Sequence, residues 1–248
     1  HNGIEYAMMQ LISEVYGLLK NVGGLSNEAL QQIFADWNKT ELQGFLIEIT
    51  ADVFLKKDDK TDALLVDMIL DKAKQKGTGM WTSQSAMDLN VPIPVIDAAV
   101  SMRYLSAMKE ERIATAEKYQ SAETTVLVNK DQLVMDCKEA LQFAFTLAYA
   151  QGLHLLHEAS AAYNYHVNIA EVARIWKGGC IIRSSLLNEI RKAYVADSAL
   201  KNIIHSPVFV ESLKRMRDAA EQLCSMGMKN KIPVAAFAAS LNYFDAYC

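Results

Sequence analysis

Helix-breaking residues are so scarce in this chain that long helices can run through most of it without interruption. Its 248 residues include only four prolines and eleven glycines. Elsewhere strong helix formers are plentiful, and apolar side chains recur every three or four residues. Both patterns favour helices over strands. We therefore predict an all-α fold.

The apolar content and the charge limit the partners of such a fold. Apolar residues make up 51% of the chain and its net charge is −4, with no block of basic residues. So many apolar residues in a helical chain predict that some helix faces are covered by another subunit or domain. The charge argues against nucleic-acid and membrane-surface partners. The longest apolar run, 232–241, falls short of the roughly 20 residues that span a bilayer.

The positions of the cysteines indicate the cellular compartment of the protein. The four cysteines form no Cys-x-x-Cys pair and lie mostly within apolar helical patterns. This usage is typical of reduced thiols in a cytosolic protein. We expect a soluble, cytoplasmic protein without disulfides.

Capping residues predict where several helices begin. Ser26 precedes a helix expected to end at Trp37, and 38–41 and 168–171 both have the Asn-x-x-Glu form of a capping box. The helix after the first box has the expected inward residues Leu42, Phe45, Leu46, Ile49 and Val53. A long helix expected over 95–119 has the inward residues Val100, Tyr104, Met108 and Ile113.

Two stretches of the chain are similar in the order of their landmarks. The paired landmarks are Gly17 with Gly152, Trp37 with Trp176, and residues 45–49 with residues 186–190. We predict an internal repeat of two similar helical bundles, about 1–119 and 132–248, connected by the polar residues 120–131. The spacings differ by several residues, so a chance similarity of amphipathic helices is the alternative.

The first six residues, His1-Asn2-Gly3-Ile4-Glu5-Tyr6, combine several groups that bind ligands. On a helix Asn2, Glu5 and Tyr6 share one face. The apolar stripe of the same helix centres on a different side and consists of Met8, Leu11, Ile12, Val15, Leu18 and Leu19. The polar face therefore presents an amide, a carboxyl and a phenol to a ligand. An ordinary solvated helix face is the alternative.

A second polar string, Lys76-Gly77-Thr78-Gly79, suits an anion. Its glycines let the backbone approach a ligand, while the lysine and the threonine supply donors for a phosphate or a carboxylate. It matches neither the P-loop nor the dinucleotide-binding spacing, so a plain turn is the alternative. Arg103 interrupts an otherwise apolar helix and needs an anionic partner, either within the structure or on a ligand.

Metal and thiol chemistry are not expected. His154, His157 and Glu158 lack the His-Glu-x-x-His order of a zinc-binding helix, and no third protein ligand is evident. We predict no metal site. Cys180 has no histidine close to it in the sequence, so core packing is favoured over a nucleophilic role.

Five strings in one colinear order resemble the decarboxylating 6-phosphogluconate dehydrogenase family. They are residues 1–6, 36–42, 45–50, 76–82 and 176–184. The resemblance implies the all-helical domain of that enzyme, built from two similar bundles, through which two subunits form a homodimer. It also implies that an N-terminal nucleotide-binding domain and a C-terminal tail are absent from this chain.

The resemblance further implies an activity and roles for named residues. Enzymes of this family oxidise 6-phosphogluconate with NADP, release carbon dioxide and form ribulose 5-phosphate, in the pentose phosphate pathway. Glu5 would be the catalytic acid that protonates the enediol, and the general base would be a lysine three residues before His1. His1 and Asn2 would hold the sugar-acid end. The residues expected to contact the substrate mainly towards its phosphate are Tyr6, Lys76, Thr78 and Arg103.

Three departures from the family pattern leave an alternative open. Met80 stands where the family usually has lysine, and the chain lacks both the lysine base and the tail that follows Cys248 in the family. NADP would be bound mainly by the absent N-terminal domain. We therefore expect this chain alone to be inactive. The alternative is a helical interaction module that keeps the scaffold of the enzyme without its catalysis.

Overall fold

A computed structural model describes residues 1–119 and 128–248. The helices are α1 Asn2–Asn21, α2 Asn27–Trp37, α3 Phe45–Leu55, α4 Leu65–Met68, α5 Thr78–Asp88, α6 Pro94–Ala107, α7 Lys109–Lys118, α8 Lys130–Ala162, α9 Ile169–Gly179, α10 Leu186–Ala196, α11 Pro207–Lys229 and α12 Ala235–Tyr247, with a 3-10 turn at Ile203–His205. Apart from two isolated β-bridges, the described residues form no β-structure. The prediction of an all-α fold is confirmed. None of these helices is both long and apolar enough to span a bilayer.

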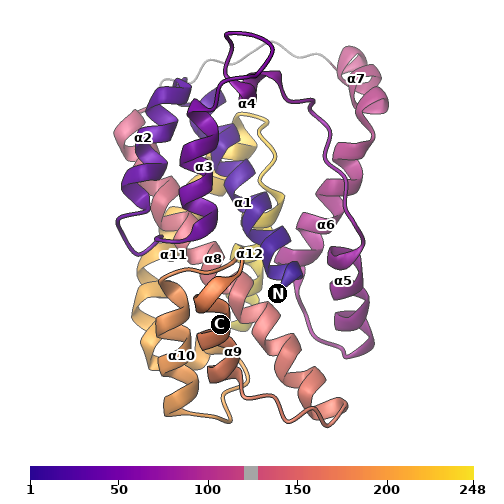
Figure 1. Ribbon diagram of the computed structural model, residues 1–248, viewed down its shortest axis with the longest axis vertical. Coiled ribbons are helices and arrows are strands. Elements are labelled where there is room, and N and C mark those ends of the chain that lie inside the picture. Colours follow the sequence, from indigo (N-terminus) through magenta and orange to yellow (C-terminus); the bar gives the residue numbers. More distant parts are fainter. Residues whose placement is uncertain (120–127) are drawn as a thin grey trace.

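Two long helices, α1 and α8, lie at the centre of the molecule (Figure 1). α1 packs against α5, α6, α8 and α12, and α8 packs against α11 as well. The predicted apolar stripe of α1, consisting of Met8, Leu11, Ile12, Val15, Leu18 and Leu19, is buried throughout. One face of α1 is therefore fixed in the core, while its first turn remains available to a site.

Two helix pairs, α2 with α3 and α9 with α10, meet at a short backbone contact. Gly44, just before α3, forms an antiparallel bridge with Ser184, just before α10. The Phe45 N–H donates to the carbonyl of Arg183 at 3.0 Å. A long helix followed by such a pair occurs twice in the chain order. This order agrees with two bundles, but the repeat stays a prediction, and part of its expected connection, 120–127, lies outside the described residues.

Two of the three predicted caps are present. Ser26 Oγ accepts from the Ala29 N–H at 3.3 Å, and the side chain of Asn168 accepts from the Glu171 N–H at 3.2 Å. The cap at Asn38 was predicted wrongly. Its side chain accepts from the N–H of Gly44, six residues on, at 2.9 Å, and α3 begins only after Gly44.

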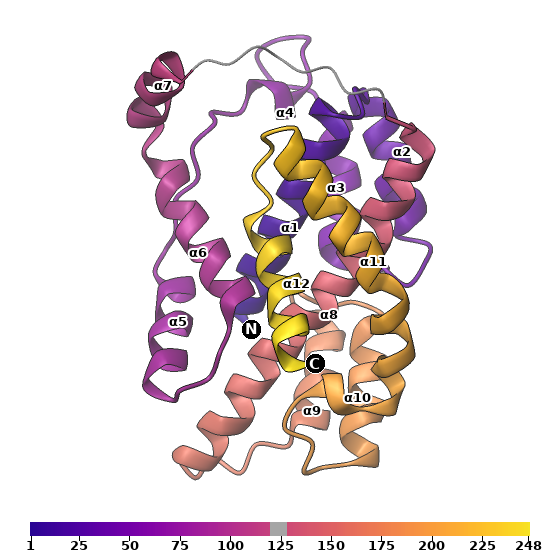
Figure 2. The ribbon, with the colours of Figure 1, turned by 180° about the vertical axis from the view of Figure 1, so that it is seen from behind.

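Several residues predicted to face inward are exposed in this chain. Ile49 and Val53 on α3 are 40% and 38% exposed, and Tyr104, Met108 and Ile113 are 44%, 45% and 49% exposed. Their inward placement was predicted wrongly. The exposed apolar positions on α6 and α7 begin after Val100, where α6 leaves the core and leads to α7 at the edge of the molecule (Figure 2).

The helix expected over 95–119 is broken at Met108 into α6 and α7. Arg112 stabilises this break, because its Nη2 donates to the carbonyl of Ser106 at 3.1 Å. The same guanidinium donates to the carbonyl of Asp71 at 2.8 Å and to its carboxylate at 3.0 Å. A continuous helix would pair the Ser106 carbonyl with a backbone N–H instead.

Candidate functional site

The first turn of α1 brings three of the predicted site residues together. His1 is the N-cap residue, and its Nδ1 lies 2.8 Å from Asn2 Oδ1 and 3.9 Å from Glu5 Oε2. The side chains of His1 and Glu5 are 24% and 17% exposed. An imidazole, an amide and a carboxyl group therefore adjoin one another at a half-open surface.

The end of α9 closes one side of this cluster. The ring of Trp176 meets the His1 ring edge-on, with 5.8 Å between the centroids. Cys180, which follows α9, donates its thiol to the Trp176 carbonyl at 3.1 Å. Burial, together with the charge of the nearby Glu5 carboxylate, raises the pKa of the Cys180 thiol. Cys180 is half-buried and packs against the edge of the core, as predicted.

Tyr6 connects the other predicted residues. Its ring is 7% exposed, and its hydroxyl accepts from the Lys76 N–H at 3.4 Å. The guanidinium carbon of Arg103 lies 4.7 Å from the centroid of the Tyr6 ring, a cation–π contact. We call Tyr6, Lys76 and Arg103 the cationic group. It begins one residue after Glu5 on the same turn of α1.

The positive charge of the cationic group is not neutralised within the described residues. Arg103 donates to the carbonyl of Lys74 at 3.1 Å and to the sulfur of Met9 at 3.7 Å, both of which are uncharged. No ion pair of Lys76 occurs in the described part of the chain, and its side chain is exposed. Neither cation is therefore held by a carboxylate of the described residues, and both are free to meet an anion.

The two positions around Thr78 require glycine for different structural reasons. Gly77 has φ +100, a left-handed conformation that side chains disfavour. A Cβ on Gly79 would come within 2.6 Å of the Tyr6 ring. These glycines let α5 begin at Thr78, directly beside the cationic group. Gly79 thus packs closely against Tyr6, while the approach of this string to a ligand stays a prediction.

A cavity of about 390 Å³ lies beside the first turn of α1 and is lined by residues of α1, α5, α8 and α9. His1 and Thr78 are the two predicted site residues that line it, together with the aromatic residues Trp81 and Trp176. Arg103 lines a separate hollow of about 360 Å³. The predicted residues therefore do not all line one cavity. The turn of α1 that carries Glu5 and Tyr6 connects them.

Trp176 was not predicted to belong to the site. The only signal in the sequence was its place in the string 176–184, just before the glycine pair 178–179. Its contact with His1 joins segments that are distant along the chain.

Two histidines of α8 lie beside a carboxylate. Glu158 Oε1 lies 3.3 Å from His157 Nδ1, 3.7 Å from His154 Nε2 and 3.7 Å from Lys201 Nζ. Across the described ranges, no three histidine, cysteine or acidic side chains are grouped so that they could hold a metal ion.

Comparison with known families identifies the chain. A model of the 6-phosphogluconate dehydrogenase C-terminal domain matches residues 1–248. The chain belongs to the 6-phosphogluconate dehydrogenase family. It is 46% identical over 248 residues to the NADP(+)-dependent, decarboxylating 6-phosphogluconate dehydrogenase of Bacillus subtilis (strain 168), covering all of this chain and 53% of the relative. It is 49% identical over 250 residues to the decarboxylating enzyme of Synechococcus elongatus, with 100% and 53% covered.

A solved structure agrees with this placement. The 6-phosphogluconate dehydrogenase of Plasmodium falciparum, known with its cofactor NADP+ and with its substrate 6-phosphogluconate, superposes with a TM-score of 0.95 at 39% identity. The match covers 100% of this chain and 53% of that protein. The chain thus spans about half the length of the 6-phosphogluconate dehydrogenases that it matches.

Proposed function

We propose that this chain is the substrate-binding and dimerising helical part of an NADP-dependent enzyme that converts 6-phosphogluconate into ribulose 5-phosphate and carbon dioxide. In the cell this reaction belongs to the pentose phosphate pathway, and we assign it to the cytoplasm. The observation that carries the proposal is the turn of α1. It joins the His1, Asn2 and Glu5 cluster to the unneutralised charges of Lys76 and Arg103.

The cluster of His1, Asn2 and Glu5, which we call the α1 cluster, suits the sugar-acid end of the substrate. In the proposed reaction, loss of carbon dioxide from the oxidised acid leaves an enediol that needs a proton on carbon. We assign the proton donor to the carboxyl group of Glu5, which is only 17% exposed and lies beside the His1 imidazole. His1 and Asn2 would hold the hydroxyl and carboxylate groups of the substrate.

The cationic group suits the phosphate end. A phosphate carries close to two negative charges and accepts several hydrogen bonds. The guanidinium of Arg103 and the ammonium of Lys76 supply the charge, while Thr78 supplies a hydroxyl at the first position of α5. The backbone N–H groups at that helix start add donors for the same anion.

The described residues alone do not form an NADP-binding site. They contain no parallel sheet and no glycine-rich turn between a strand and a helix, which bind the pyrophosphate of a dinucleotide. When bound, NADP supplies the hydride acceptor. We propose that it is held mainly by an N-terminal domain outside this chain, and that this chain's residues mainly bind the substrate.

Exposed apolar side chains support a homodimer. Many of them lie on α3, at and after the end of α4, and along α6 and α7: Ile49, Leu55, Met68, Ile69, Leu70, Tyr104, Leu105, Met108, Ile113 and Tyr119. Exposed apolar side chains of this kind are typical of a surface that another subunit covers. The same surface accounts for the residues of α3, α6 and α7 that were predicted to face inward.

The test is an assay of the full-length protein with 6-phosphogluconate and NADP. We expect NADPH and carbon dioxide to form in equal amounts. Binding of 6-phosphogluconate without turnover would favour the non-catalytic scaffold instead. Absence of binding by calorimetry would contradict the proposed substrate site and leave the interaction module.

A further inference from the structure

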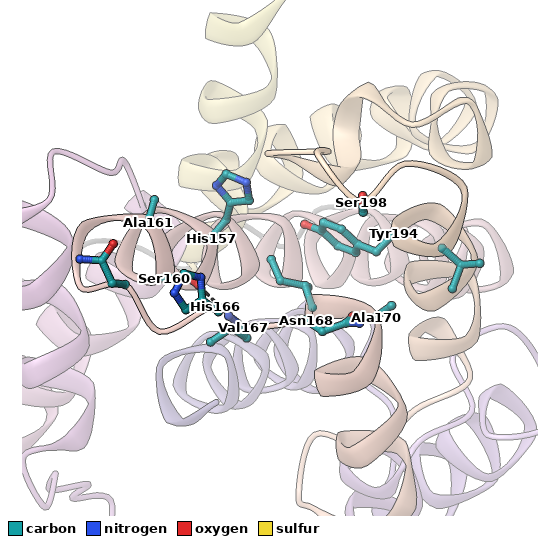
Figure 3. Close-up of a pocket in the computed structure, with 12 residues that line it drawn as sticks. His157, Ser160, Ala161, His166, Val167, Asn168, Ala170, Tyr194 and Ser198 are labelled. Atoms are coloured by element: carbon teal, nitrogen blue, oxygen red, sulfur yellow. Dashed lines mark hydrogen bonds between the residues drawn. The ribbon is translucent and has the colours of Figure 1, made fainter.

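A second and larger cavity lies away from the turn of α1. It has a volume of about 600 Å³ and lies where the end of α8, the start of α9 and the end of α10 meet (Figure 3). We call it the α9 cavity. Its size is within the range of about 300–1,000 Å³ that is usual for small-molecule sites. None of the residues assigned to the proposed function lines it.

The strongest sign of a ligand in the α9 cavity is the hydroxyl group of Tyr194. This residue lines the cavity and is 3% exposed, and its hydroxyl has no hydrogen-bond partner. In Figure 3 the oxygen of Tyr194 points along α8 towards the side of the cavity where His157 lies. Burial raises the pKa of this hydroxyl, so it keeps its proton and acts as a donor. A buried donor without a partner is costly unless something in the cavity accepts from it.

The start of α9 supplies two more donors to the same cavity. The cap at Asn168 satisfies only the N–H of Glu171. Ile169 and Ala170, the first two residues of this eleven-residue helix, line the cavity, and no acceptor within the helix reaches their N–H groups. The positive end of the helix dipole lies at the same place.

The charges around the α9 cavity also favour an anion. No aspartate or glutamate lines it, whereas His157 and His166 do; Nδ1 of His157 faces Glu158, which leaves its Nε2 for a ligand. Three acidic residues adjoin lining residues in the sequence, and each accepts from a neighbour. Glu158 Oε1 lies 3.3 Å from His157 Nδ1, Glu171 Oε2 lies 2.6 Å from Arg174 Nε, and Asp197 Oδ1 accepts from the Ala199 N–H at 2.9 Å.

We propose that the α9 cavity binds an oxyanion, the carboxylate or phosphate group of a small metabolite, separately from the substrate site. The Tyr194 hydroxyl and the N–H groups of Ile169 and Ala170 donate to its oxygens. The imidazoles of His157 and His166 flank it. The proposal concerns binding, and no bond of the ligand is made or broken.

The test uses the chain's own histidines as reporters in the full-length protein. Inorganic phosphate and, in a second series, acetate are titrated while the imidazole signals of His157, His166 and His1 are followed by NMR. We expect saturable shifts at His157 and His166, with a dissociation constant of roughly 1–10 mM. A phosphate that binds only at the substrate site would shift His1 alone, which would overturn the proposal. A response to phosphate or to acetate alone would tell which oxyanion the cavity accepts.

Two variants and a matched control make the test specific. Tyr194→Phe keeps the ring and removes the donor, so phosphate binding should weaken about tenfold. Ile169→Pro removes one N–H at the helix start, where the extended backbone of Asn168 accommodates a following proline, and it should also weaken binding. Tyr243→Phe removes a buried hydroxyl that already accepts from Asn202, and it should leave binding unchanged. Equal affinity in wild type and Tyr194→Phe would refute the proposal.

Discussion

The guanidinium carbon of Arg103 lies 4.7 Å from the centroid of the ring of Tyr6, the residue that follows Glu5 on α1. Tyr6 therefore lies between the proposed acid and the two cations. Its ring packs against Ala99 and Val100, and its hydroxyl accepts from the Lys76 N–H, so these contacts fix the ring in place without Arg103. A change that moves Tyr6 should therefore disturb both the acid and the cations at once.

Replacing the proposed acid removes a proton without removing a hydrogen-bonding group. Glu5→Gln in the full-length protein should lower kcat by at least about 100-fold, because general acid catalysis contributes roughly 10²- to 10⁴-fold. The Michaelis constant for 6-phosphogluconate should stay within about tenfold. Steady-state kinetics measure both, with the exposed Glu211→Gln as control. An unchanged kcat would remove Glu5 from the mechanism.

The close approach of α5 to α1 predicts the effect of one added methyl group. A Cβ on Gly79 would lie 2.6 Å from the Tyr6 ring, whereas a Cβ on Gly178 would meet nothing within 4 Å. Gly79→Ala should destabilise the chain by about 1–3 kcal/mol and raise the Michaelis constant, because the ring has to move. Gly178→Ala should change neither. Thermal melting and kinetics of the two variants check this, and equal behaviour of the pair would contradict the packing argument.

The buried carboxyl group of Glu14 makes the stability of the folded chain depend on pH. Its carboxyl group is 4% exposed and accepts from the N–H groups of Ala236 and Phe237 at 2.9 and 3.1 Å. Burial raises its pKa from 4.5 to about 7, against the effect of these hydrogen bonds. Between pH 4.5 and 7 the unfolded chain releases this proton while the folded chain keeps it, so stability falls as pH rises, by about 3 kcal/mol in total.

The variant Glu14→Gln cannot ionise and should not show this loss. Its free energy of unfolding relative to wild type should therefore rise between pH 4.5 and 7 and stay level above pH 7. Urea unfolding followed by circular dichroism across this range measures the difference. A difference that is constant with pH would mean that Glu14 titrates alike in the folded and unfolded chain.

Features set by neighbouring residues were predictable from the sequence. The all-α fold follows from sparse helix breakers, and the caps at Ser26 and Asn168 act on N–H groups three residues away. The buried stripe of α1 follows from its periodicity. Each of these depends on side chains within about one turn, so the amino-acid pattern alone contains the information.

Features set by distant contacts were not predictable. The side chain of Asn38 accepts from the N–H of Gly44 and does not cap a helix. Periodicity also could not show that the apolar residues of α6 beyond Val100 are left exposed. The contact of Trp176 with His1 joins two helices far apart in sequence. Helical periodicity identifies residues that share a face, but the partner of that face comes from tertiary packing.

The central claim is that the cationic group binds the phosphate and the α1 cluster binds the sugar acid. Calorimetric titration of full-length wild type and Arg103→Ala with 6-phosphogluconate and with gluconate, which lacks the phosphate, separates the two. Arg103→Ala should bind 6-phosphogluconate at least about tenfold more weakly, since a hydrogen bond to a charged group contributes roughly 1.5–3 kcal/mol, and should bind gluconate as wild type does. An equal loss of affinity for both ligands, or for neither, would contradict the account.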